Sequence, residues 1–570
     1  MNIKAASLDA QGPLYGESTL KVVTSGNLSN HDSIAARSGV TLEVGGLLSN
    51  QGVIEAGVNP DTSRNAQGDL AINAQNLDNH GKTLVASRDL ILTTRESLDN
   101  QGGTLSAGRD GQINAATLDN RNQGRVLGAG AQTINSSQLL DNRGGLVAAQ
   151  SLEIAAPRVD NRGGELSSRG DANLRADHLD NSEAGKVLAA QALTLRIAGL
   201  LNNQAGLVDG NTLGITSASL FNRQGSLHSV ADLSLNQSGL LDNQAGKIVA
   251  GQRATLTLGK LDNQNKGHLE AKAGMQLATG ELLNQQGGRV FSEAGLTLDL
   301  ARGRLNNDGG LVAATGPLVF ERLADVFNRQ GEISSGQSFV LSADNLDNTQ
   351  GKVLGDQAVT LLITQALNNT KGRIAAAGIE VRSGTLDNLD GTVASRAGQQ
   401  VYVQQVLNNQ QGEISAAGTH HLEAGSLLNQ KGRVLSDTQL SVKLRGALNN
   451  QAGVLGAADL LDVKALSLDN RTKGSLASDG RLELRLDDTL DNRNGSVVAL
   501  GSLELHAAKA DNRIGGLIGS DQSSILRVAE VDNRGGEISA QDGIDSAGQV
   551  LDNSDGKLLG VPAWPLSWSI

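Results

Sequence analysis

The sequence predicts an all-β protein that folds as a right-handed parallel β-helix, a solenoid of about 26 coils of roughly 20 residues each. Three observations lead to this prediction. A short triplet recurs at a nearly constant interval along the 570 residues, apolar residues alternate in short runs between the copies, and glycine and asparagine separate those runs.

The repeated triplet is an apolar residue, any residue, and then asparagine. It occurs 26 times, at spacings of 19 to 23 residues apart from one gap of 29. The longer phrase VDNRGGE begins at both Val159 and Val531, and a degenerate further copy is expected at Leu8-Asp9-Ala10. Asparagines in register on stacked coils can form a ladder in which each amide bonds to the next rung. The predicted ladder includes Asn142, Asn161, Asn181, Asn243, Asn263, Asn348, Asn388, Asn470, Asn492 and Asn533.

The two positions before the asparagine are constrained differently. The first of them is Leu in 22 copies, Val in three and Ala in one, so we expect it to face a core. The second is Asp in 15 copies and otherwise Asn, Ser, Phe or Leu. That tolerance predicts a position that points mostly outward.

The rest of each unit alternates as strands do. In the unit that follows Asn142, Val147 and Ala149 form one alternating pair, Leu152 and Ile154 form a second, and Val159 closes the unit. Period-two alternation in short runs predicts strands. The Gly and Asn residues between the runs predict turns, because both tolerate the left-handed backbone of tight corners.

The repeats divide the chain into a shaft over residues 1–553 and a non-repeat tail over 554–570. The gap of 29 residues before Asn79 contains the stretch 57–67, which we predict to be an insertion loop because of its Pro, Asn and Asp residues. The ending VPAWPLSWSI breaks the pattern. It is interpreted either as a small cap or as non-native readthrough after a truncation.

Composition argues against several classes of function. The chain has no Cys, which excludes disulfides and Cys-ligated zinc. Its net charge of −12 is spread along the sequence, so we expect no nucleic-acid partner. His420 and His421 are adjacent strand residues that should point to opposite faces, and the acid pair Asp487-Asp488 is expected to be solvated. We therefore predict no catalytic residue, no metal site and no cofactor.

The tripeptide Arg169-Gly170-Asp171 is a weak candidate for cell binding. It lies between two predicted strands, where a loop could display it to integrins. A tripeptide of this kind also arises by chance in a chain of this composition, so the alternative is an ordinary turn.

The repeat unit resembles the haemagglutinin repeat of filamentous haemagglutinin-like exoproteins, which include contact-dependent growth inhibition effectors. The resemblance extends over nearly the whole chain. It is clearest in LDNRGGLVAAQSLEIAA (140–156), LDNQAGKIVAGQRATLTL (241–258) and LDNRNGSVVALGSLELHAA (490–508). It implies a β-helical filament that an outer-membrane transporter of the two-partner type secretes to the Gram-negative cell surface. It also implies receptors on host or bacterial cells.

Other parts of that family are not found in this sequence. The start, MNIKAASLDAQG, has no apolar stretch of a secretory signal, and no secretion domain or toxin region is recognised. We therefore expect a shaft segment with open ends that could associate end to end. Three functions stay open: shaft of an adhesin, shaft of a growth-inhibition toxin, and, more distantly, a β-helical polysaccharide-processing enzyme. The few aromatic residues, 2% of the chain, argue against the enzyme because sugar-binding clefts use aromatic platforms.

Overall fold

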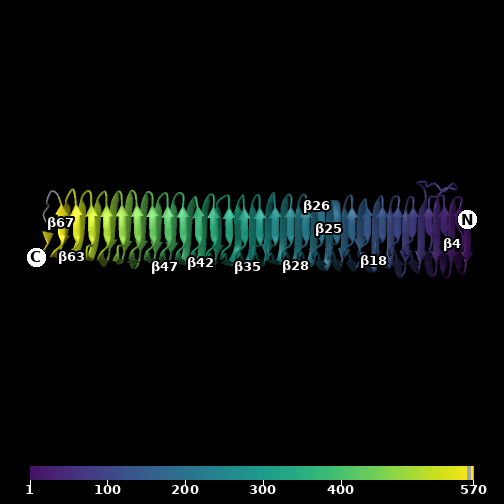
Figure 1. Ribbon diagram of the computed structural model, residues 1–570, viewed down its shortest axis with the longest axis horizontal. Coiled ribbons are helices and arrows are strands. Elements are labelled where there is room, and N and C mark those ends of the chain that lie inside the picture. The colour runs from purple at the N-terminus through teal and green to yellow at the C-terminus, as the bar shows by residue number, and fades with distance from the viewer. Residues whose placement is uncertain (561–566, 569–570) are drawn as a thin grey trace. The chain divides into compact units, whose positions relative to one another are not determined.

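The computed structural model describes residues 1–560 and 567–568. Every regular element in those ranges is a β-strand, and strands of successive coils pair in parallel. The chain makes about 27 coils with a spacing of about 21 residues, so the predicted parallel β-solenoid is confirmed. Two compact units are distinguished, Met1–Leu282 and Leu283–Ile570. Figure 1 shows the strands of each unit stacked side by side in chain order.

Many coils of the first unit contain a short strand, a second strand and a third that ends one residue before the ladder asparagine, whereas in others these strands merge, as in β25 (Lys186–Asn202). One such coil consists of β19 (Leu146–Ala149), β20 (Ser151–Ala155) and β21 (Arg158–Asp160). It pairs in register with the next coil, formed by β22 (Glu165–Ser168), β23 (Ala172–Ala176) and β24 (His178–Asp180). The pairing sets equivalent residues of adjacent coils opposite one another.

Coils of the second unit follow the same plan. One of them consists of β38 (Glu332–Ser335), β39 (Phe339–Ala343) and β40 (Asn345–Asp347). In the next coil the second and third strands merge into β42 (Ala358–Asn368), which follows β41 (Lys352–Gly355). A register shift between Ile363 and Ala366 marks the corner where separate strands would have ended.

The core of each unit is a stack of aliphatic columns. Val147, Leu152, Ile154 and Val159 are all buried, as the alternation predicted. The apolar residue two positions before the ladder asparagine is buried in every repeat copy except the last, where Leu551 is half-buried. Because each coil buries its apolar residues against the coils above and below, stability belongs to the array rather than to a single coil.

The first repeat copy is recognisable only by its place in the stack. Strand β2 (Leu8–Ala10) pairs in register with β5 (Leu28–Asn30), and Ala10 occupies the place of the asparagine. The degenerate copy predicted at Leu8-Asp9-Ala10 is therefore a genuine coil of the solenoid.

From Asn79 onward the left-handed backbone lies two residues after the ladder asparagine, not at the asparagine. No ladder asparagine has a positive φ, whereas Gln350, two residues after Asn348, has φ of 56°. Gly144 takes the same place after Asn142 with φ of 63°. The expectation that asparagine itself adopts the left-handed conformation is thus wrong. Its side chain is instead committed to bonds inside the stack.

The interval with 29 residues forms a loop between β9 (Val53–Ala56) and β10 (Asp69–Ala74). The loop is fastened to earlier coils by a hydrogen bond from the Tyr15 hydroxyl to the Val58 carbonyl and by one from Asn65 to the Arg37 carbonyl.

At the other end, β67 (Lys557–Gly560) pairs with β64 (Glu537–Ala540), so the coil pattern continues into the predicted tail. The interpretation of VPAWPLSWSI as cap or readthrough falls mostly on residues 561–566 and 569–570, outside the described residues. Across the described ranges, no helix has the length and apolarity needed to cross a membrane.

Candidate functional site

The feature that runs through both units is the asparagine ladder. In the first unit, each side-chain amide from Asn30 to Asn243 donates through Nδ2 to the Oδ1 of the asparagine one coil further on, at 2.7 or 2.8 Å. In the second unit, the same bonds run from Asn284 to Asn553 at 2.6 to 2.8 Å. All ten asparagines of the sequence prediction lie in these two columns and are buried.

Each rung also bonds to the backbone. Asn348 Nδ2 donates to the Gly351 carbonyl of its own turn at 3.2 Å, and it lies 3.5 Å from the Arg373 carbonyl of the next coil. A buried amide satisfied on both its nitrogen and its oxygen joins two coils without leaving an unpaired polar group. At the start of the column Ala10 replaces asparagine, and the buried Oδ1 of Asn30 has no donor among the described residues.

Glycine after the turn lets the coils approach this closely. A Cβ at Gly351 would overlap the carbonyl oxygen of Asn328 one coil earlier and would lie 2.6 Å from Asn348 Oδ1. Gly164 and Gly391 have the same surroundings in their own coils. The glycine that follows the asparagine in the repeat is therefore required by close packing of the ladder.

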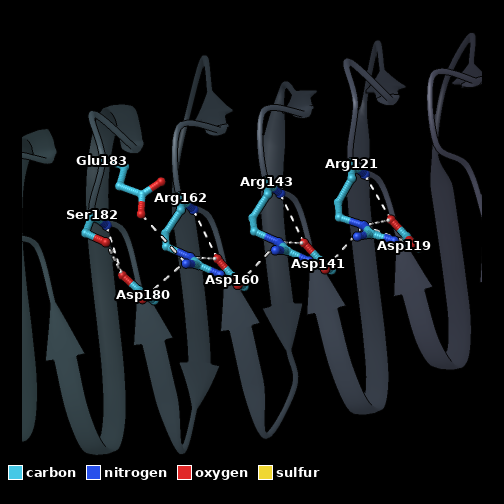
Figure 2. A network of polar contacts seen from close by, with 9 residues as sticks. All are labelled: Asp119, Arg121, Asp141, Arg143, Asp160, Arg162, Asp180, Ser182 and Glu183. Carbon is cyan, nitrogen blue, oxygen red and sulfur yellow. Dashed lines mark hydrogen bonds and ion pairs between the residues drawn. The ribbon is translucent and has the colours of Figure 1, made fainter.

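A second ladder, of aspartate and arginine, lies beside the first. Figure 2 shows it in the first unit, where Asp119, Asp141 and Asp160 each pair with the arginine two residues later. Arg143 Nη2 lies 2.7 Å from Asp141 Oδ2, and its Nε lies 3.5 Å from Asp160 Oδ2 of the next coil. Each arginine thus bridges two coils, and charges of opposite sign alternate along the stack.

The second unit repeats this ladder over four arginines. Arg534, for example, pairs with Asp532 at 2.7 Å and lies 3.5 Å from Asp552. The arginines of the two ladders are Arg121, Arg143, Arg162, Arg471, Arg493, Arg513 and Arg534. Sequence reasoning did not identify them. The signal was present in seven Asp-Asn-Arg triplets at the repeat position.

The sequence predicted that the aspartate column points mostly outward, and this prediction is wrong. Its members are largely half-buried, and Asp141 and Asp242 are 7% and 2% exposed. The reason is that the carboxylate caps the turn: Asp99 Oδ1 accepts a hydrogen bond from the Gln101 backbone N–H at 2.9 Å. Ser can make a similar but weaker local bond, and Ser29 and Ser49 occupy the same column.

The aspartate–arginine ladder predicts a loss of stability in acid. The hydrogen bond from Arg534 holds the pKa of Asp532 below its ordinary value. A carboxylate with a lowered pKa stabilises the fold above about pH 4, and that stability is lost as the pH falls through the lowered pKa. We expect amides of β63 (Ser524–Asp532) to exchange faster at pH 2.5 than at pH 5, after correction for intrinsic rates.

The matched variant is Asp532→Asn, which removes the titrating group. It should exchange faster than the wild type at pH 5 and show a much smaller change on acidification. Equal acid sensitivity in the two proteins would contradict a stabilising role for the pair.

His420 and His421 lie on opposite faces, as expected for adjacent residues of β49 (His420–Ala424). His420 is fully buried, and burial lowers its pKa to about 4. His421 lies outside and contacts Glu423 at 2.8 Å. The described residues contain no group of three or more His, Cys, Asp or Glu side chains that could hold a metal ion.

The burial of His420 predicts a pH-dependent weak point. Unfolded histidine binds a proton near pH 6.5, whereas buried His420 does so only near pH 4, so stability falls as the pH drops across that interval. We expect His420→Leu to remove this dependence, measured as exchange of β49 amides at pH 7 and pH 4.5. His421→Gln is the control and should behave as the wild type. An unchanged pH dependence in His420→Leu would refute the assignment.

The tripeptide Arg169-Gly170-Asp171 forms the turn between β22 and β23. Its glycine N–H donates to the Gln150 carbonyl, and Asp171 Oδ1 accepts from the Ala192 backbone N–H at 3.0 Å. The Arg169 and Asp171 residues are exposed, but the turn is stacked between neighbouring coils. The acid pair Asp487-Asp488 is likewise an exposed turn.

Stacked parallel coils, a buried amide column and a flanking charge ladder define a structural repeat protein whose recurring side chains join its own coils. The chain belongs to the haemagglutinin-repeat family. The family profile matches residues 2–59, 58–102, 96–144, 139–196, 179–245 and 498–560, together more than half of the chain.

Relatives with curated names are similar over parts of this chain. A protein named tRNA nuclease CdiA from Yersinia mollaretii is 25% identical over 456 residues, which cover 62% of this chain and 15% of the relative. Deoxyribonuclease CdiA from Dickeya dadantii is 29% identical, covering 45% and 7%. Toxin CdiA from Escherichia coli is 30% identical, covering 46% and 10%. The chain thus spans a small fraction of these relatives. No solved structure matches the chain significantly.

Proposed function

We propose that this chain is the structural shaft of a secreted exoprotein at the surface of a Gram-negative cell. The observation that carries the proposal is the unbroken asparagine ladder within each unit, since it uses the most constrained side chains of the repeat to hold coils together. Family membership supports the same role. On this account the chain acts by length and stiffness, and it performs no catalysis.

Secretion and partners follow from the family as part of the same proposal. The chain would cross the outer membrane through a transporter of the two-partner type and would present other parts of the exoprotein to receptors on host or bacterial cells. End-to-end self-association and cell binding by Arg169-Gly170-Asp171 stay separate predictions. The double variant Arg169→Gln with Asp171→Asn tests cell binding by the tripeptide. Integrin binding that persists in this variant would contradict that prediction.

Such a shaft could belong to an exoprotein that delivers a toxin or to one that adheres to cells. The names of the relatives, which include a toxin and two nucleases, favour an exoprotein that delivers a toxin to neighbouring bacteria. The family description favours adhesion. A co-culture experiment distinguishes the two uses, with bacteria that express the exoprotein mixed with bacteria that lack its gene. Killing of the second strain indicates the toxin, and binding to host cells without killing indicates the adhesin.

A block exchange tests the shaft role itself. Residues 349–450 contain five repeat intervals, and residues 143–243 contain five others. Replacing the former by a second copy of the latter in the encoding gene should preserve secretion and surface activity. Deleting residues 349–450 should preserve secretion but shorten the reach by roughly 24 Å, at about 4.8 Å per coil. If the exchange abolishes surface activity although the length is unchanged, the replaced coils carry a specific site and the spacer role is wrong.

A further inference from the structure

A groove of about 910 Å³ crosses successive coils of the first unit, from Thr94 to Thr216. It lies at the corner where the second strand of each coil ends and the chain turns toward the third. Its floor contains small residues such as Ala115, Ala156 and Ala176, all of which are buried by the surrounding coils. The small side chains leave a shallow groove that runs across the strands.

Three arginines line this groove without forming an ion pair within the described ranges. Arg95, Arg175 and Arg196 are exposed, and none makes an ion pair with any described residue. Arg175 and Arg196 are register partners on β23 and β25 (Lys186–Asn202), so two cations leave adjacent strands directly opposite one another. Like charges in that arrangement are destabilising. The one carboxylate among the lining residues is Asp177.

The arginines of the neighbouring corner differ from those of the groove. On the neighbouring corner each ladder arginine is matched by aspartates of its own and the next coil. The chain as a whole carries 60 acidic and 48 basic residues, so carboxylates are not scarce. An opposed, unmatched arginine pair is explained if an anionic ligand supplies the missing charge.

Neutral polar groups in the groove also lack partners. Asn135 Nδ2 donates to Asn114 Oδ1 at 3.0 Å, which leaves the Nδ2 of Asn114 and the Oδ1 of Asn135 for a ligand. A donor and an acceptor side by side suit the amide groups of a polypeptide backbone.

We propose that this groove docks an extended acidic segment of a partner protein, with its carboxylates on Arg175 and Arg196. Guanidinium forks bind carboxylates in a bidentate manner, and arginine clusters recognise acidic motifs. No aromatic side chain lines this groove. Glycans and single-stranded nucleic acids usually need such platforms for stacking, so the lining favours a peptide over both.

The second unit has a groove of about 710 Å³ at the same corner of its coils. Lys443 and Lys464 line it and are register partners on β52 (Gln439–Leu444) and β55 (Leu460–Ala465), again without an ion pair to a described residue. Lysine lacks the planar fork of arginine. This groove also contains Glu423 and the ring of Tyr402, which Arg382 covers at 4.4 Å. We therefore expect this groove to bind an acidic segment more weakly than the groove of the first unit, so the two grooves can be compared in one chain.

The test is fluorescence anisotropy of the full chain with a labelled octaglutamate peptide, and with octaglutamine as the uncharged probe. Arg175→Gln with Arg196→Gln should weaken octaglutamate binding at least tenfold. Arg37→Gln with Arg125→Gln removes the same charge from exposed positions outside the groove and should change it less than twofold. Lys443→Gln with Lys464→Gln should also have a small effect. Octaglutamine should not bind.

Several results would overturn the proposal. Equal loss in the Arg175/Arg196 and Arg37/Arg125 variants would indicate bulk charge rather than a site. Tighter binding of a uronate oligosaccharide or an oligothymidylate, lost in the same variant, would assign the groove to another ligand class. A photo-crosslinkable octaglutamate on the wild-type chain provides a check that needs no variant. Adducts should fall within residues 94–216, and adducts elsewhere would contradict the assignment.

Discussion

Replacing Gly351 by alanine is expected to destabilise the coils around it by about 3 kcal/mol or more. The added Cβ would overlap the Asn328 carbonyl oxygen and press on Asn348 Oδ1, and both belong to the packed ladder. Backbone atoms cannot rotate away as a flexible side chain can, so the two coils must separate. Hydrogen exchange should show this as loss of protection in β38 and β41, which pair with each other beside the site.

The control is Gly378→Ala in the same unit. A Cβ there would have only Ala358 Cβ at 3.8 Å and the Gly398 carbonyl at 3.9 Å as near neighbours. We expect this variant to be neutral or slightly more stable, because alanine restricts the unfolded chain. Similar losses in both variants would show that glycine is needed for another reason than close packing of the ladder.

Asn348→Leu is expected to lower the local free energy of opening by about 2–4 kcal/mol. The change removes the donor to Asn369 Oδ1 and to the Gly351 carbonyl, and it removes the acceptor for Asn328 Nδ2. Each buried polar group left unpaired costs roughly 1–3 kcal/mol, although part of this is regained by relaxation. Backbone strain does not contribute, because Asn348 has no positive φ.

The neighbouring change Asp347→Ser tests whether the loss is specific to the ladder. Asp347 accepts hydrogen bonds from the backbone N–H and the hydroxyl of Thr349, and serine can keep a similar turn. We expect a loss below about 1 kcal/mol. In hydrogen exchange, Asn348→Leu should accelerate amides of β40 and β41 at least about fivefold more than Asp347→Ser does. Equal acceleration would contradict the separate roles of the two columns.

The fold was predictable because its signal is repeated. A single leucine such as Leu140 could belong to many structures, but the same residue type at every interval specifies a core column. The asparagine ladder was predictable for the same reason. The left-handed residue was not, because position 350 is Gln, position 144 is Gly and position 205 is Ala, so no residue type marks it. Its conformation follows from the ladder bonds of the preceding asparagine.

Interactions between coils were the harder part to predict. Arg143 follows Asp141 by two residues, and the sequence alone does not tell whether its guanidinium stays on that carboxylate or also reaches Asp160. The groove at Arg175 and Arg196 depends on which residues face one another across coils. Coil lengths vary between 19 and 23 residues. For positions far from the asparagine, the sequence alone therefore does not tell which residues of adjacent coils are opposite one another, and the structure is needed to assign these pairs.

The most direct test of the coil-on-coil register uses cysteine pairs, since the chain has no cysteine of its own. Ser441 and Asp462 are register partners on adjacent coils, with Ser441 Oγ 3.4 Å from Asp462 Oδ2. Adjacent strands lie about 4.8 Å apart, within reach of a disulfide. We expect Ser441→Cys with Asp462→Cys to oxidise to an intramolecular disulfide, whereas Ser441→Cys with Lys464→Cys, offset by two residues, should not. Cross-linking of the offset pair but not of the register pair would contradict the stacked, in-register solenoid.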